Sequence, residues 1–179
     1  MIIALCLLSV LGTDQGLVER PLERPRDIWV FRSVLDNRAR MVTIALNDSL
    51  WVAYDATNCG MYKAWKGGVR FDGAVYTTVH GPQPTTRGNA YWDGLVDADV
   101  WELESNGKVV KVKPTFRGYR FYGKEVTLNY EFKLGGRVVK VSETPEYFRV
   151  NHFVGLERKF ETSGLLGGGE AEVSCEQAC

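Results

Sequence analysis

The chain has 179 residues, enough for one domain with a substantial core, and its 45% hydrophobic content excludes a disordered chain. Lys plus Arg and Asp plus Glu both number 22, so the formal net charge is zero. A balanced chain lacks the overall positive charge of most nucleic-acid-binding domains, so we expect no nucleic-acid partner.

The first twelve residues, MIIALCLLSVLG, are almost wholly apolar and end abruptly at polar TDQG. This run is too short to span a bilayer as a helix, and it suits the apolar region of a secretory signal. We therefore predict a signal peptide at 1–12, a periplasmic or secreted location, and no membrane span after signal removal. The alternative is a buried N-terminal strand or helix. Residues 13–26, with Pro21 and Pro25, are predicted to form a polar extended arm.

From residue 27 onward, short β-rich runs alternate with turn residues. Asn58-Cys59-Gly60 predicts a tight turn that pairs 51–55 with 61–65 as a hairpin. Lys66-Gly67-Gly68 is predicted to break the ladder, and a Pro-Gln-Pro segment ends the run after it because proline donates no backbone hydrogen bond. The strands predicted in this half are 28–34, 41–46, 50–54, 61–65 and 69–79.

Residues 85–98, TTRGNAYWDGLVDA, are predicted to form the longest loop. Asn106-Gly107 then predicts a hairpin between 100–105 and 108–113, since both turn residues tolerate positive φ. Strict alternation of apolar and polar residues predicts a half-buried strand at 126–134. Two further strands are predicted at 137–142 and 155–162, the second with Leu156, Arg158 and Phe160 on one face.

No stretch of ten or more residues has a helical stripe of apolar side chains. The predicted fold class is therefore all-β, an antiparallel β-sandwich of about ten short strands spanning 27–163. Residues 164–179 form a Gly-rich tail, either a truncated linker to a further domain or a natural terminus.

The reactive residue types are sparse and show no catalytic spacing. His80 and His152 are the only histidines, and no Cys or His pair has the short spacing typical of zinc sites, so we predict no metal site. Cys175 and Cys179 are a candidate local disulfide. The sequence contains no nucleophile elbow, phosphate loop or dinucleotide fingerprint.

Aromatic residues near turn signals are the candidates for ligand binding, because their faces give large contact area at low entropic cost. Trp51, Tyr54 and Tyr130 lie on regular alternating strands and are predicted to fill the core instead. Tyr91 and Trp92 are the best ligand candidates because they fall in the predicted loop. The full set of candidate ligand-binding residues is Trp65, Arg70, Tyr76, His80, Tyr91 and Trp92.

The segment RPRDIWVFRSVLDNRARMVTIALNDSLWVAYDATNCGMYKAWKGGVRFDGAVYTTVHGPQP resembles the β-rich leader domain of exported bacterial c-type cytochrome proteins. GKEVTLNYEFKLGGRVVKVSETPEY and VGLERKFETSG are similar to that domain's second half, so the resemblance covers about 25–165. It implies export, an electron-transfer setting and haem c in an adjoining domain. The chain itself ends in GGGEAEVSCEQAC without a Cys-x-x-Cys-His motif, so we expect no haem and no other cofactor within it.

The predicted function is a non-catalytic exported β-sandwich module of a larger redox protein, which docks a partner domain or ligand on an aromatic face between Trp65 and Trp92. Arg38, Arg40, Lys66 and Arg70 are candidates to orient an anionic or polyol group there. The alternative is a carbohydrate-binding or mutarotase-like sandwich enzyme. Its catalytic candidates are His80 with a carboxylate partner, Asp72 or Asp93.

Overall fold

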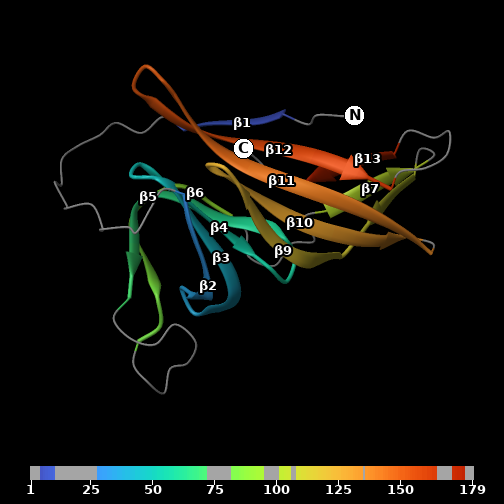
Figure 1. Cartoon of the computed structure of the whole chain (residues 1–179), viewed down its shortest axis with the longest axis horizontal. Coiled ribbons are helices and arrows are strands. Elements are labelled where there is room, and N and C mark those ends of the chain that lie inside the picture. The colour runs from blue at the N-terminus through green and yellow to red at the C-terminus, as the bar shows by residue number, and fades with distance from the viewer. Residues whose placement is uncertain are drawn as a thin grey trace.

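The computed structural model describes residues 28–71, 82–94, 101–105, 108–134 and 136–164, together with the backbone of 5–10 and 171–175. At 103–105, 108 and 134 it likewise describes the backbone alone. Every element in these residues is a β-strand and every strand pair is antiparallel, which confirms the predicted fold class (Figure 1).

Two five-stranded sheets make up most of the described structure. The first, which we call the meander sheet, has its strands in sequence order. Its strands are β2 (Trp29–Leu35), β3 (Arg38–Asn47), β4 (Leu50–Asp55), β5 (Gly60–Arg70) and β6 (Thr85–Asp93). The second, the long sheet, has the order β1-β12-β11-β10-β9. Its strands are β1 (Leu5–Val10), β9 (Pro114–Tyr122), β10 (Glu125–Leu134), β11 (Arg137–Val150) and β12 (Phe153–Ser163).

A third, small sheet lies beside them in the order β13-β7-β8. Its strands are β7 (Trp101–Ser105), β8 (Lys108–Lys111) and β13 (Ala171–Cys175). Trp101 anchors it, because the indole N–H donates to the carbonyl of Asn58 at 3.0 Å and the ring lies 5.6 Å from Tyr130.

The main core fills the space between the meander sheet and the long sheet. Alternate residues of β10, from Val126 to Phe132, are buried against alternate residues of β3 and β4, as the period of two predicts. The main core comprises Val42, Ile44, Leu46, Leu50, Val52, Tyr54, Cys59, Met61, Ala64, Trp101, Val112, Val126, Leu128, Tyr130, Phe132, Val139, Val141 and Leu156.

The meander sheet also buries its other face. Leu35, Met41, Ala45, Trp51, Ala53, Trp65 and Val69 form a second cluster there, which we call the curl core. As a result, Met41 to Leu46 of β3 are all buried, and so are Leu50 to Tyr54 of β4. Trp51 and Tyr54 are both packing residues, as predicted, but they point to opposite faces.

The meander sheet curls because the turn between β2 and β3 reaches the residues before β6. Asp36 and Asn37 both have positive φ, 51° and 63°, which suits a two-residue type I′ hairpin turn. The backbone N–H of Asp36 donates to the carbonyl of Pro84 at 3.0 Å. This contact brings the two edges of the sheet together around the curl core.

Two bulges and a glycine pair shape β5 and β6. Tyr62 and Tyr91 are the extra residues at the register shifts, so each is unpaired in its ladder. Gly67 lies opposite Gly88, with φ of 132° and 106°, and a Cβ on Gly67 would lie 2.1 Å from the carbonyl oxygen of Arg87.

Two sequence predictions were therefore wrong. Lys66-Gly67-Gly68 does not break the ladder, because β5 runs on to Arg70, and residues 85–93 of the predicted loop form strand β6. The glycines permit close approach of the two strands where we expected them to interrupt one. The predicted hairpins β4–β5 and β7–β8 are confirmed, and the predicted strands at 126–134 and 137–142 are present as β10 and the first part of β11, which pair with each other.

Strands also form within both predicted terminal segments. β1 pairs with β12 and β13 pairs with β7, so residues of the predicted signal and of the Gly-rich tail add backbone strands at sheet edges. The division into signal, arm, domain and tail stays a prediction.

Candidate functional site

The predicted ligand residues do not share one open surface. Trp65 is 0% exposed in the curl core, where its indole N–H donates to the carbonyl of Gly68 at 2.9 Å, so its ring is inside the protein. Arg70 ends β5 and is exposed. Asp72, Tyr76, His80 and Cys179 lie outside the described residues, as does the side chain of Cys175.

Tyr91 and Trp92 lie on strand β6 and pack partly buried against the main core. Consecutive strand residues normally point to opposite faces, and the bulge at Tyr91 explains how both rings contact the same core. Asp93 follows them with an exposed side chain that is ion-paired to Lys63, at 3.4 Å between Oδ2 and Nζ. Its carboxylate is thus compensated by a cation.

A polar network centred on Asp36 holds the curl of the meander sheet. Asp36 accepts hydrogen bonds from the backbone N–H of Thr86 at 2.7 Å, from the Thr86 hydroxyl at 3.0 Å and from the Tyr62 hydroxyl at 3.0 Å. Lys63 adds a cation 3.5 Å from the same carboxylate. Burial, followed by the charge of Asp36, raises the pKa of Tyr62, so Tyr62 stays a donor. The network joins the turn between β2 and β3 to strands β5 and β6, and these contacts occupy both oxygens of the Asp36 carboxylate.

A second polar group lies inside the main core. Glu143 of β11 is 0% exposed, and its two oxygens accept bonds from Arg158 Nε at 2.6 Å and from the Tyr130 hydroxyl at 2.8 Å. The Arg158 guanidinium lies over the rings of Phe160 and Tyr54, at 5.0 and 5.8 Å from their centroids. A buried charge requires such compensation, so this pair is an internal structural element.

Tyr54 and Cys59 complete the buried group. The Tyr54 hydroxyl is buried near Glu143 and Arg158, but no described atom forms a hydrogen bond of good geometry with it. Burial, followed by the charge of Glu143, raises the pKa of Tyr54 and of the free Cys59 thiol. Cys59 is thus an inert core thiol and not a nucleophile.

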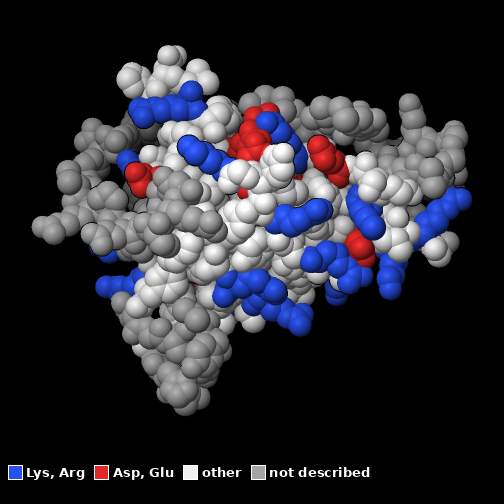
Figure 2. All heavy atoms as spheres, in the orientation of Figure 1, with Lys and Arg blue, Asp and Glu red and all other residues white. Residues whose placement is uncertain are grey.

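Positive and negative residues are distributed unevenly along the chain. Residues 108–140 contain nine Lys and Arg against two Glu, a formal charge of +7 that the rest of the chain balances. Figure 2 shows Lys and Arg side chains over the part of the surface where Figure 1 places β9, β10 and β11, with few acidic side chains among them.

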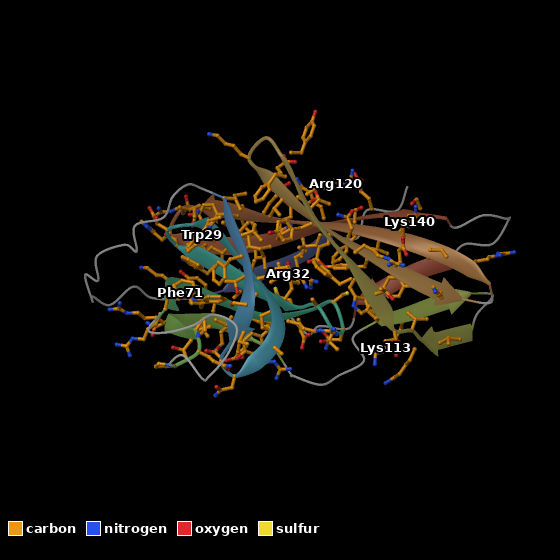
Figure 3. All side chains as sticks on the ribbon, turned by 60° about the horizontal axis from the view of Figure 1, so that its bottom comes forward. Trp29, Arg32, Phe71, Lys113, Arg120 and Lys140 are labelled. Carbon is orange, nitrogen blue, oxygen red and sulfur yellow. The ribbon has the colours of Figure 1, made fainter. Side chains whose placement is uncertain are left out.

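The strand register gathers five of these cations on one face of the long sheet. All five are exposed, and three of them lie next to buried residues in the alternating pattern. Arg120 lies opposite Thr127, on the outer side of β10, and Arg117, at the register shift of β9, is paired with Glu131 on that same side. The five cations therefore point away from the main core. We call this set the basic face: Lys113, Arg117, Arg120, Lys133 and Lys140. Figure 3 labels three of them, spread along this side of the ribbon.

Most of the basic face carries uncompensated charge. Arg117 is paired with Glu131 at 2.6 Å. The other four members form no ion pair with a described residue. Sequence reasoning missed this face because it summed charge over the whole chain. The sequence feature that could have revealed the face was the excess of Lys and Arg between 108 and 140, combined with the alternation of inward and outward residues along the strands.

No known protein family, curated protein or solved structure matches the chain. Among the described residues there is no helix that could cross a membrane. The same residues contain no cluster of His, Cys, Asp and Glu suited to a metal ion.

Proposed function

We propose that this chain is a non-catalytic binding module of a larger exported protein, and that it docks an anionic partner on the basic face. The observation that supports this most is the segregation of charge: a chain of zero net charge carries +7 within residues 108–140, and five of the cations in this segment lie on one face of the long sheet. Such a field attracts and orients oppositely charged partners.

The packing of the ionisable groups also favours binding over catalysis. Acid–base catalysis needs a group that can reach substrate. Glu143 is enclosed with Arg158 and Tyr130, and Asp36 is committed to the curl of the meander sheet. These two networks hold the strands in place, and a rigid sheet is a suitable platform for docking.

The wider setting comes from the sequence resemblance alone. The leader domains of exported c-type cytochrome proteins sit beside a haem-binding segment, so an adjoining haem domain or a protein partner fits the proposal. Haem would belong to that adjoining domain.

Cation-exchange chromatography tests the proposal. We expect the full chain to bind a sulfopropyl resin at pH 7 despite its zero net charge, and the double variant Arg120→Glu with Lys140→Glu to elute at clearly lower salt. The matched control is Arg87→Glu with Arg149→Glu, two exposed arginines away from the basic face with the same change in net charge. The control should elute near the unmodified chain. Equal shifts of the two variants would show that only net charge matters and would refute a docking face.

A further inference from the structure

We propose that the anionic partner is an acidic polysaccharide, one that carries sulfate or carboxylate groups along a sugar chain. This inference rests on the proposed function and names the chemistry of its partner. It draws on the shape of the basic face, the polar side chains between its cations and the charges at its border.

The basic face is long and narrow, which fits a chain molecule better than a single small anion. Lys113 immediately precedes β9 and Arg120 lies near the other end of that strand, about 20 Å away at the usual rise of a strand. Arg120 lies opposite Thr127 on β10, while Lys140 of β11 lies opposite Glu131 of β10. The cations therefore follow the length of the strands over a width of about 10 Å, since neighbouring strands are about 4.8 Å apart.

Hydroxyl and amide side chains lie beside the cations. The hydroxyls of Thr127 and Thr144 are 3.0 Å apart, and Ser142 donates to the Asn129 side chain at 3.2 Å. All four are partly buried, so they are held in place by the sheet. Each hydroxyl can form more than one hydrogen bond, which leaves capacity for the hydroxyl groups of a sugar.

The distribution of aromatic rings disfavours the other common polyanions. Single-stranded nucleic acids stack successive bases on several aromatic side chains. Among the described outward positions of β9 and β10, Tyr122 is the one aromatic residue, and it is 84% exposed. A single ring at the end of the face can pack on one sugar ring. A membrane would require a broad apolar surface, and the residues between the cations are polar apart from Val138, which is 40% exposed.

Acidic side chains mark one border of the basic face. Glu161 of β12 lies opposite Ser142, and Glu146 of β11 is bound by Lys159 at 2.7 Å. Lys159 compensates Glu146, but Glu157 and the exposed Glu161 on the same strand leave this border with more carboxylates than cations. Because these carboxylates repel a polyanion, they confine it to β9, β10 and the N-terminal part of β11. A polymer bound there runs along the strands.

The test measures the affinity of the full chain for heparin, polygalacturonate, oligothymidylate and phosphatidylserine vesicles at about 0.15 M salt. We expect heparin or polygalacturonate to bind most tightly, with affinity that falls as salt rises. The Arg120→Glu, Lys140→Glu variant should bind the polysaccharide at least about tenfold more weakly than the unmodified chain. The Arg87→Glu, Arg149→Glu control should bind it less than about twofold more weakly. The Thr127→Val, Thr144→Val variant should weaken polysaccharide binding while its retention on sulfopropyl resin stays unchanged.

Tighter binding of oligothymidylate or vesicles would overturn the inference, as would no binding of either polysaccharide. If resin retention still depended on Arg120 and Lys140, the binding module would stand and only the polysaccharide would be excluded. If resin retention were also insensitive, the proposed function itself would fail.

Discussion

Two buried tyrosines in the main core allow a matched test of what its polar group contributes to stability. Tyr130 and Tyr54 are each 1% exposed, and both lie near Glu143. The Tyr130 hydroxyl donates to Glu143 at 2.8 Å, whereas the Tyr54 hydroxyl has no well-aligned partner among the described atoms. Replacing each with Phe removes the same single oxygen from the same core.

The two substitutions should therefore differ in cost. A hydrogen bond to a charged group contributes about 1.5–3 kcal/mol, so Tyr130→Phe should lower the free energy of unfolding by about that amount. A buried hydroxyl without a partner carries a desolvation cost, so Tyr54→Phe should change stability by less than about 0.5 kcal/mol or raise it. Arg158→Met sets the scale, because it leaves Glu143 as an uncompensated buried charge at a cost of about 3–5 kcal/mol.

Urea unfolding at pH 7, followed by far-ultraviolet circular dichroism, measures all three variants against the unmodified chain. The expected order of destabilisation is Arg158→Met, then Tyr130→Phe, then Tyr54→Phe. Equal costs for the two tyrosine variants would refute the reasoning, since they would mean that the bond to Glu143 contributes nothing beyond burial of the hydroxyl. A cost below about 1 kcal/mol for Arg158→Met would refute the compensated ion pair.

Three further predictions concern pH, backbone geometry and targeting. The raised pKa values of Cys59 and the buried tyrosines mean that the folded chain keeps protons which the unfolded chain releases. The contribution of these groups to stability should thus be fully present at pH 7 and decline above about pH 8.5 in urea titrations. Cys59→Ala should delay this decline to about pH 10. Stability that stays level between about pH 7 and about pH 10 in the unmodified chain would contradict this. Gly67→Ala should lower the free energy of unfolding by more than about 3 kcal/mol, because its Cβ would meet the Arg87 carbonyl. The control, Gly118→Ala, also has positive φ but open space around it, and should cost about 1–3 kcal/mol. Similar costs for the two variants would mean that φ alone determines the effect. Residues 1–26 fused to a reporter that is active only after export should yield activity, and none would exclude the predicted signal.

The alternation of apolar and polar residues predicted the long sheet well. Each of its strands from β10 to β12 has one face in the main core and one in solvent, so a period of two survives in the sequence. The same alternation put Arg158 on the face of Leu156 and Phe160. A charged residue on the apolar face of a strand indicates that an oppositely charged partner is buried nearby. On β11, the inward positions Val139 and Val141 are followed two residues later by Glu143, which is the partner of Arg158.

The meander sheet was harder to predict, because its central strands are buried on both faces and its glycines act in pairs. Gly67 and Gly88 each look like strand breakers when read alone, and only their cross-strand pairing makes both compatible with a continuous ladder. The bulges at Tyr62 and Tyr91 have no local sequence signal. The basic face was missed for a related reason, since it forms from residues on three strands whose register no single segment reveals.

The double burial of β3 and β4 has a consequence for how this chain can change over time. Residues 41–46 and 50–54 have no side chain that faces solvent, so every position in them is constrained by neighbours above or below the sheet. In a saturation mutagenesis scan, every position in these two strands should tolerate few substitutions, whereas in β10 every second position should tolerate many. Neutral substitutions should therefore accumulate mainly at the solvent-facing positions of the long sheet, which is the surface that carries the basic face.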